Sequence, residues 1–323
     1  MNSPKINIPQ FIIPVFILFF NAIMIIFPKE IFLGAKNGLE IWFNTVVPSV
    51  LPFMITINIL VGLGVPRVIG RLIQPVTLRL FRLTGTQAFV LLVGLTAGFP
   101  LGLKLTAQLY RSGEITKPEA YRLMLFCNNA GAMFVTGTVG AGFFSSAKAG
   151  YYILLCGVLS VFTLVCLSGI FSPAAAPAHT PVHIKHFDQA LLSSAMENAG
   201  RAALFIGGYI ILFSVLMQVC DTLHLFDAPA RVLALLGLDK QLSRAAAAGF
   251  FEMTNGCQYA AGGGRANIIT AAVLCGWGGL SVHAQSIQFL GGTDLSCIPY
   301  IAGKALTALL CFCYAVILWG IFR

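Results

Sequence analysis

The chain has 323 residues, of which 58% are hydrophobic and only 10% are charged. A soluble domain carries about 25% charged residues, so this composition excludes an ordinary soluble fold and predicts an all-α protein that crosses a membrane several times. The net charge of +9 is what basic cytoplasmic loops would supply, and it does not indicate binding of nucleic acid.

The first third of the chain begins with two apolar runs and a basic segment. No charge lies between Lys5 and Lys29, so we assign residues 1–40 to a first transmembrane helix and its connector. A second uncharged run follows over 41–66. Four arginines then interleave with apolar residues over 67–83, the pattern of an amphipathic helix that lies in the membrane interface.

Helix-breaking residues crowd into the next uncharged run. Gly94, Gly98, Pro100 and Gly102 lie within nine residues of one another. Such a cluster inside apolar sequence predicts a re-entrant hairpin near residues 86–110, with a tip buried against protein. The alternative is a continuous helix on which small residues four apart pack against a neighbour.

The first of two repeats extends over residues 41–171. Its later part contains an apolar run with a polar centre, CNNAGAM (127–133), which predicts a helix broken at mid-depth, and then a plain spanning helix over 149–171. Residues 172–198 form a linker rich in proline and histidine. Its histidines lack cysteine or acidic neighbours at ligand spacing, so no metal site is predicted there (His179, His183 and His186).

The remainder, residues 199–323, repeats this plan. Segments that begin at 51, 94 and 148 have counterparts that begin at 203, 249 and 304, at offsets of 152, 155 and 156 residues. The second hairpin is predicted near 246–264, and another polar-centred run follows over 275–285. If each repeat crosses the bilayer three times, the second copy is inverted relative to the first. The predicted fold is therefore two inverted repeats with about seven transmembrane helices and two re-entrant hairpins.

Polar residues at the four interruptions are the candidate binding residues. A charge inside the bilayer costs about 2.5–3.5 kcal/mol on insertion scales and tends to be functional. Lys104 and Glu252 are such charges. They pair with each other, contact a substrate or coupling ion, or lie at the water interface. Lys148 and Lys304 are interpreted instead as side chains that reach the interface. The candidate substrate-binding residues are Thr96, Gly98, Lys104, Asn128, Asn129, Glu252, Thr254, Asn255, Ser281, His283 and Gln285.

These residue types indicate transport chemistry and no catalysis. Lys104 and free helix N-termini suit an anion, whereas a buried Glu252 suits a coupling proton or sodium ion. His283 could relay protons, although a lone histidine in a helix break is more often a plain hydrogen-bonding residue. The sequence contains no P-loop and no HExxH motif, so we predict neither an enzyme nor a cofactor apart from the coupling ion.

Three stretches carry a family resemblance. FNTVVPSVLPFMI (43–55), AGFPLGLK (97–104) and CNNAG (127–131) resemble the YlbJ-type sporulation integral membrane proteins of the nucleoside recognition or Gate domain family, which is related to the spore maturation proteins. The similarity runs from about residue 30 to the end and is strongest over 43–144. The chain departs from many relatives at Phe99, where they have tyrosine, and at 127–129, where they have Ser-Ser-Asn.

The resemblance implies the repeat-and-hairpin plan of concentrative nucleoside transporters. For this branch it also implies movement of dipicolinic acid, a small aromatic dicarboxylate, towards the forespore. We therefore expect a secondary transporter for a small anionic metabolite that works by alternating access. The alternatives are a cation-coupled transporter of nucleoside-like solutes and a non-transporting gate or scaffold in a sporulation complex.

The expected partners and cellular location follow from these predictions. The partners are the anionic solute, membrane lipid and other copies of the chain in a homo-oligomer. The expected location is a bacterial cell membrane, or a forespore membrane, as an integral multi-pass protein.

Overall fold

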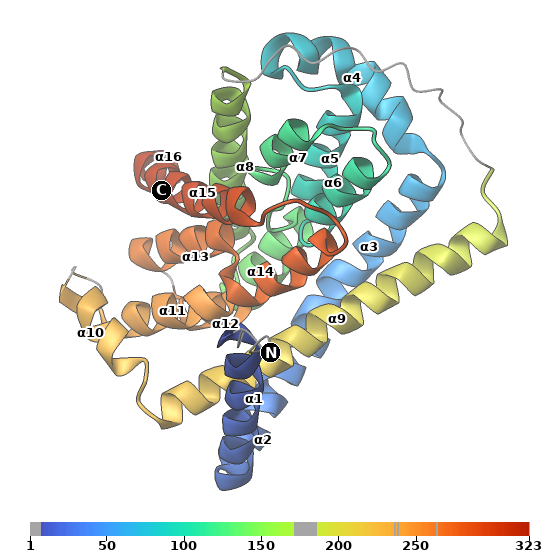
Figure 1. Cartoon of the computed structure of the whole chain (residues 1–323). Helices are drawn as coiled ribbons and strands as arrows, with labels where there is room; N and C mark the ends of the chain where they lie inside the picture. The colour runs from blue at the N-terminus through green and yellow to red at the C-terminus, as the bar shows by residue number, and fades with distance from the viewer. Residues whose placement is uncertain (1–7, 171–185, 236, 238, 263, 323) are drawn as a thin grey trace, which may run out of the picture.

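The structure is a computed structural model that describes residues 8–170, 186–235, 237, 239–262 and 264–322. Within them every regular element is a helix (Figure 1). Five helical stretches are long and apolar enough to cross a membrane, and a sixth is added if one bent pair of helices counts as a span. Two further apolar helices are shorter, Ile17–Ile26 and Phe134–Phe143. The prediction of an all-α polytopic membrane protein is confirmed.

The N-terminal part is more helical than expected. After α1 (Ile8–Ile26), the elements α2 (Pro28–Ile41), η1 (Trp42–Val46) and α3 (Val47–Gly62) run on as one helix of 35 residues. The predicted connector before residue 40 belongs to this helix. Proline at the first helical position starts it without loss of a hydrogen bond.

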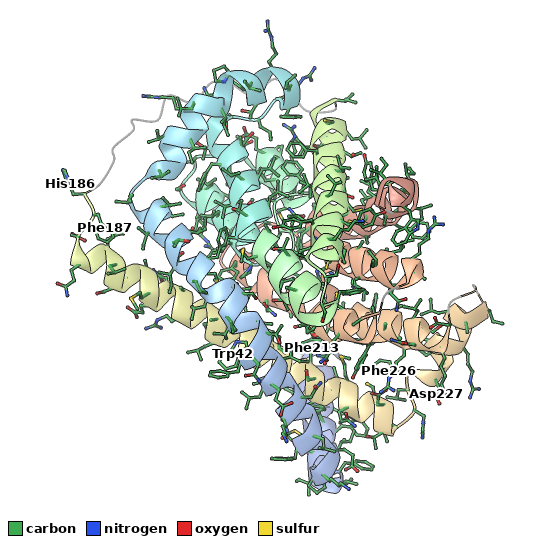
Figure 2. The ribbon with its side chains drawn as sticks, turned by 180° about the vertical axis from the view of Figure 1, so that it is seen from behind. Trp42, His186, Phe187, Phe213, Phe226 and Asp227 are labelled. Carbon is green, nitrogen blue, oxygen red and sulfur yellow. The ribbon has the colours of Figure 1, made fainter. Side chains whose placement is uncertain are left out.

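The long helix α9 (Gln189–Thr222) crosses this N-terminal helix and contacts all three of its parts (Figure 1). Trp42 lies at the crossing (Figure 2), where its indole nitrogen donates to the carbonyl oxygen of Ala203 on α9 at 2.9 Å. The start of α9 is fixed by Asp188, whose carboxylate accepts from the backbone nitrogen of Leu191 at 2.7 Å. The helix therefore begins inside the predicted linker. His179 and His183 lie outside the described residues.

The remaining elements follow in chain order through the two predicted repeats. The first half continues with α4 (Val65–Phe81), α5 (Gly85–Thr96), α6 (Leu101–Arg111), α7 (Lys117–Met124), η2 (Phe134–Phe143) and α8 (Ala147–Ile170). After α9, the second half continues with α10 (Asp227–Leu235), α11 (Lys240–Phe251), α12 (Met253–Tyr259), α13 (Arg265–Trp277), α14 (Gly279–Ile287), η3 (Gln288–Leu290), α15 (Ile298–Ile317) and α16 (Trp319–Phe322).

Contacts between the halves are reciprocal. The plain spanning helices α8 and α15 pack against each other. In the first half α6 contacts α14 of the second, and in the second half α12 contacts η2 of the first. Each hairpin's second arm thus reaches the broken helix of the other half, as expected of two related units. Their inversion across the bilayer and the re-entrant course of the hairpins stay predictions.

Both predicted hairpins are interrupted helices. The first breaks between Thr96 and Leu101, and the second breaks at Glu252. The glycine stripe of the alternative interpretation exists as well, because a Cβ on Gly94 or on Gly102 would lie 1.7 or 1.8 Å from the carbonyl oxygen of Cys127. The stripe therefore packs against the unwound stretch of residues 127–131, not against a helix.

Candidate functional site

A cavity of about 50 Å³ lies where the interruptions of both halves meet. Three of its side chains are polar, those of Glu252, Thr254 and Gln285. The remaining lining residues are small or apolar: Val46, Val50, Ala97, Phe99, Gly131, Phe134, Ile206, Ile210, Met253 and Val282. A water molecule occupies about 30 Å³ in the liquid, so in this state the cavity is too small for an organic metabolite.

The first hairpin tip reaches this place because glycine allows its backbone to approach another backbone closely. Gly98 has φ of +78°, a conformation that L side chains rarely adopt. A Cβ there would lie 2.3 Å from the backbone nitrogen of Gly131. The next residue, Phe99, donates its backbone N–H to the carbonyl oxygen of Asn129 at 2.8 Å. The tip is therefore fixed to the unwound stretch 127–131.

The second hairpin tip is organised around Glu252. The side chain is 1% exposed and caps α12. One carboxylate oxygen accepts from the backbone nitrogen of Thr254 at 3.0 Å, and the other accepts from the backbone and side-chain nitrogens of Asn255 at 2.6 and 2.8 Å. These bonds occupy the free N–H groups at the N-terminus of α12. That terminus is not open to a substrate anion in this state.

Asn255 connects this tip to two other helices. Its side-chain nitrogen also donates to the hydroxyl of Ser214 on α9 at 2.8 Å, and its side-chain oxygen accepts from Asn37 on α2 at 3.2 Å. Asn37 and Ser214 were not predicted as site residues, since nothing local in the sequence distinguishes them. Their role follows from the crossing of α2 and α9.

A second buried network joins Asn128 of the first half to the second half. The side-chain nitrogen of Asn128 donates to the hydroxyls of Ser286 and Tyr300 at 2.8 and 3.3 Å, and its side-chain oxygen accepts from the backbone of Leu103 at 3.4 Å. The Tyr300 hydroxyl lies 3.0 Å from Nδ1 of His283. The polar centres of the two broken helices therefore hydrogen-bond to one another.

Lys304 lies in this network, and its interpretation as an interfacial lysine is wrong. The residue is 2% exposed, and its Nζ donates to the carbonyl oxygen of Asn128 at 3.1 Å. Nζ also lies 5.3 Å from the ring centroid of Phe99, which lines the cavity. In the described part of the chain, no carboxylate lies within ion-pair distance of Lys304. Its counterpart Lys148 is exposed.

The sequence does contain a signal for Lys304. Tyr300, Lys304 and Thr307 stand at positions i, i+4 and i+7 and therefore share one face of α15. All three are at most 2% exposed. A polar stripe along one face of an apolar helix indicates a face that packs against protein, and here this face includes the contacts with Asn128.

Among the described residues outside the C-terminal helix, two buried polar atoms stand without a hydrogen-bond partner. They are the side-chain oxygen of Asn129 and Nε2 of His283, in residues 6% and 4% exposed. Orphaned buried polar atoms are rare and indicate a place that water or a ligand completes. Asn129 also lines a smaller cavity of about 30 Å³.

Some predicted residues lie outside this arrangement. Thr96 donates to the carbonyl oxygen of Leu92 in its own helix at 2.8 Å. Lys104 is partly exposed, lies 5.8 Å from the ring centroid of Phe289, and forms no ion pair with Glu252. Ser281 is not a lining residue, but it is fully buried and accepts from the side chain of Gln285, which lines the cavity, at 3.3 Å.

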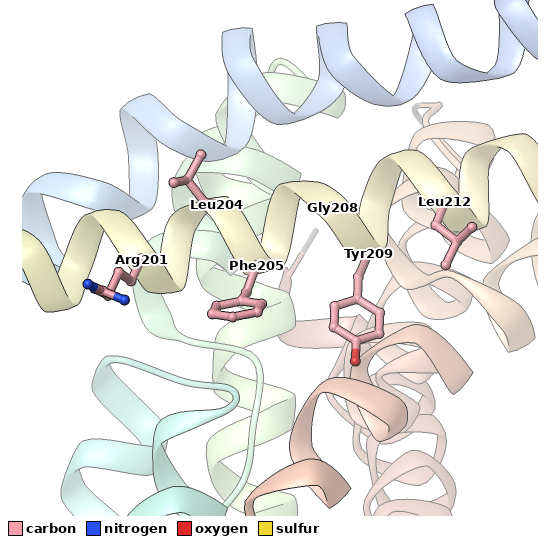
Figure 3. A pocket seen from close by; sticks show the side chains of 6 residues that line it. All are labelled: Arg201, Leu204, Phe205, Gly208, Tyr209 and Leu212. Carbon is pink, nitrogen blue, oxygen red and sulfur yellow. The ribbon is translucent and has the colours of Figure 1, made fainter.

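A larger hollow of about 460 Å³ lies elsewhere, along α9 (Figure 3). Its lining comes from this one helix, and it opens outwards. The hollow contains none of the polar residues of the helix breaks, so we do not assign it to the site.

Comparison with known proteins agrees with the sequence resemblance. The family model described as Gate, nucleoside recognition, matches residues 43–172. The sporulation integral membrane protein YlbJ of Bacillus subtilis (strain 168) is 31% identical over 348 aligned positions, which cover 99% of this chain and 84% of the relative. No solved structure matches. With its Gate region and its several membrane-spanning helices, the chain belongs to the family of YlbJ-type sporulation integral membrane proteins.

Proposed function

We propose that the protein is a secondary transporter for a small anionic metabolite, and that the cavity between the two sets of helix breaks is its binding site. The observation that carries the proposal is Lys304, a buried lysine beside this cavity that has no carboxylate partner among the described residues. A charge at membrane depth costs about 2.5–3.5 kcal/mol on insertion scales. A static scaffold gains nothing that would offset this cost. A protein that binds an anion gains the interaction of the buried charge with that anion.

Phe99 connects the lysine to the cavity. Phe99 lines the cavity, and its ring contacts Nζ of Lys304. A rotation of this ring would uncover the ammonium group and allow it to contact a bound carboxylate. The aromatic and aliphatic lining suits a flat ring. Dipicolinic acid combines such a ring with two carboxylates and is the candidate that the family resemblance supplies.

Glu252 is the proposed site of the coupling ion. Glu252 lines the same cavity, and a bound proton or sodium ion would remove the buried negative charge. Alternating access then requires that the cavity widen towards one side of the membrane at a time.

The test compares two lysines in purified protein reconstituted into liposomes. Lys304→Gln removes the buried charge, and Lys104→Gln is the matched control on a residue outside the cavity. We expect uptake of labelled dipicolinate at limiting concentration to fall about 10- to 100-fold in Lys304→Gln, the range for one charge-assisted hydrogen bond. Uptake by Lys104→Gln should stay within about twofold of the wild type, at equal insertion into the membrane.

A panel of solutes separates the alternatives. The nucleoside recognition description of the matching family makes a cation-coupled nucleoside transporter the second candidate. Uptake of nucleosides but not of dicarboxylates would show that the substrate is a nucleoside and not an anionic metabolite. Protein that inserts normally and moves neither class would contradict transport and favour the scaffold.

A further inference from the structure

The charges of α9 indicate how deep its residues lie in a bilayer. Arg201 and Asp221 bound an uncharged stretch of 19 residues, Ala202 to Cys220. At 1.5 Å per residue this stretch is about 28 Å long, close to the roughly 30 Å of a hydrocarbon core. Arg201 therefore lies at the level of the lipid headgroups, and the residues after it extend into the hydrocarbon.

The hollow of about 460 Å³ begins at this arginine and follows the helix inwards. Arg201, Phe205 and Tyr209 form one row at spacings of four, and Leu204, Gly208 and Leu212 form the neighbouring row (Figure 3). Gly208 contributes no side chain, so the trough is open at its middle. Arg201 and Leu212 are eleven positions apart, or about 16 Å along the axis.

We propose that this trough binds one anionic phospholipid, with an acyl chain along the two rows and the phosphate at Arg201. This lipid is distinct from the transported solute, and its site does not depend on the proposed transport. Leu204 and Phe205 are 65% and 63% exposed, which suits contact with an acyl chain. Arginine presents five donors in a planar fork that matches phosphate.

Glu197 is the charged group that competes for this arginine. One of its carboxylate oxygens accepts from Nε and from one terminal nitrogen of Arg201, at 3.0 and 2.7 Å. Both side chains are largely exposed, at 70% for Arg201 and 62% for Glu197. Exposed ion pairs of this kind contribute little, and N–H donors remain for a phosphate.

The bound lipid would lie behind one wall of the central cavity. Ile206 and Ile210, which line that cavity, follow Phe205 and Tyr209 directly in α9. A lipid in the trough therefore supports the helix whose movement would widen the cavity.

Native mass spectrometry of the full chain in detergent tests the lipid site. Phosphatidylglycerol and diacylglycerol are added at equal concentration, because they share acyl chains and differ in the phosphate. We expect the wild type to retain phosphatidylglycerol about fivefold better, the factor for one basic residue near an anionic surface. Arg201→Gln should remove this preference, and Glu197→Gln should keep or increase it.

Gly208→Leu tests the trough itself. A Cβ at Gly208 meets no atom within 4 Å, so the variant should fold and lose the bound lipid. Gly200→Leu is the matched control, because Gly200 lies on the same helix, is equally unobstructed and does not line the trough. Equal lipid retention in both variants would overturn the proposal, as would a preference that survives Arg201→Gln. A change in the number of chains per particle in Gly208→Leu would overturn it in favour of an interface between copies.

Discussion

Single polar residues hold the two halves together at the centre of this molecule. Asn128 donates to hydroxyls of Ser286 and Tyr300 in the other half, and Lys304 donates to the carbonyl oxygen of Asn128 in return. In a medium without competing water, loss of one partner leaves the other unsatisfied. The free energy of unfolding should therefore be sensitive to the loss of single polar atoms in this network.

Tyr300→Phe tests this dependence. The change removes a hydroxyl that Asn128 and His283 both contact, and we expect a loss of about 1–3 kcal/mol in unfolding free energy. Chemical or thermal unfolding in detergent, followed by circular dichroism, measures it. Tyr314→Phe is the control, because that hydroxyl bonds only the half-buried Thr163. Equal losses in both variants would contradict a special role for the central network.

Gly98→Ala tests the close approach of the first hairpin tip. Gly98 and Gly113 have similar φ values of +78° and +71°, but a Cβ clashes with backbone only at Gly98. Gly113→Ala should cost about 1–2 kcal/mol for the left-handed conformation alone. Gly98→Ala should cost clearly more, because the tip must move away from residues 127–131. Similar unfolding curves for the two variants would show that the tip does not need this contact.

At the scale of elements, the positions of the helix breaks were predicted better than the residues from other helices that pack against them. Glycine and proline disrupt helices locally, so the break near Pro100 could be located from the residues themselves. The break at Glu252 was located from a charged residue at the corresponding place in the second repeat. The burial of Lys304 was not predicted, although the polar face that it shares with Tyr300 and Thr307 was a signal for it; the protein that covers this face comes from the first half. Asn37 and Ser214 were missed because two helices distant in the sequence bring them to Asn255.

Outside the membrane-spanning segments, a polar link joins the two halves. Tyr110 and Lys117 each donate to a carboxylate oxygen of Asp294 at 2.7 Å. The guanidinium of Arg111 donates to the carbonyl oxygens of Phe289 and Gly291 at 2.6 and 2.7 Å. Together they hold the loop before α15 against the ends of α6 and α7.

Asp294→Asn should loosen this loop. Hydrogen bonds from Lys117 and then Tyr110 hold the pKa of Asp294 below its usual value, so at neutral pH the carboxylate is charged and the link is complete. Hydrogen exchange at neutral pH should become faster over residues 291–297 in the variant. Glu114→Gln is the control, because its side chain bonds only within its own loop.

The pH dependence of the link has a definite sign. A depressed carboxyl pKa adds stability that is present above the unfolded-state pKa, about 3.9 for aspartate. This stability is lost only as the pH falls through the lower folded-state value. The link should therefore be unchanged from neutral pH down to about pH 5. A loop that opens between pH 7 and pH 5 would contradict it.

At the scale of the whole molecule, the two halves meet around a small cavity. Both sets of helix breaks line it, as the repeated sequence predicts, but its volume of about 50 Å³ is below that of an aromatic dicarboxylate. A transporter of such a solute must therefore adopt at least one wider state. The reciprocal contacts of α6 with α14 and of α12 with η2 are the contacts that would have to change.

An electron cryomicroscopy map of the protein in lipid nanodiscs with saturating dipicolinate tests the proposed site most directly. We expect density for one solute between Phe99 and Glu252, a carboxylate in contact with Lys304, and a cavity wider than the present 50 Å³. Solute density away from both helix breaks, or a cavity that stays this small while the solute is transported, would contradict the shared binding site.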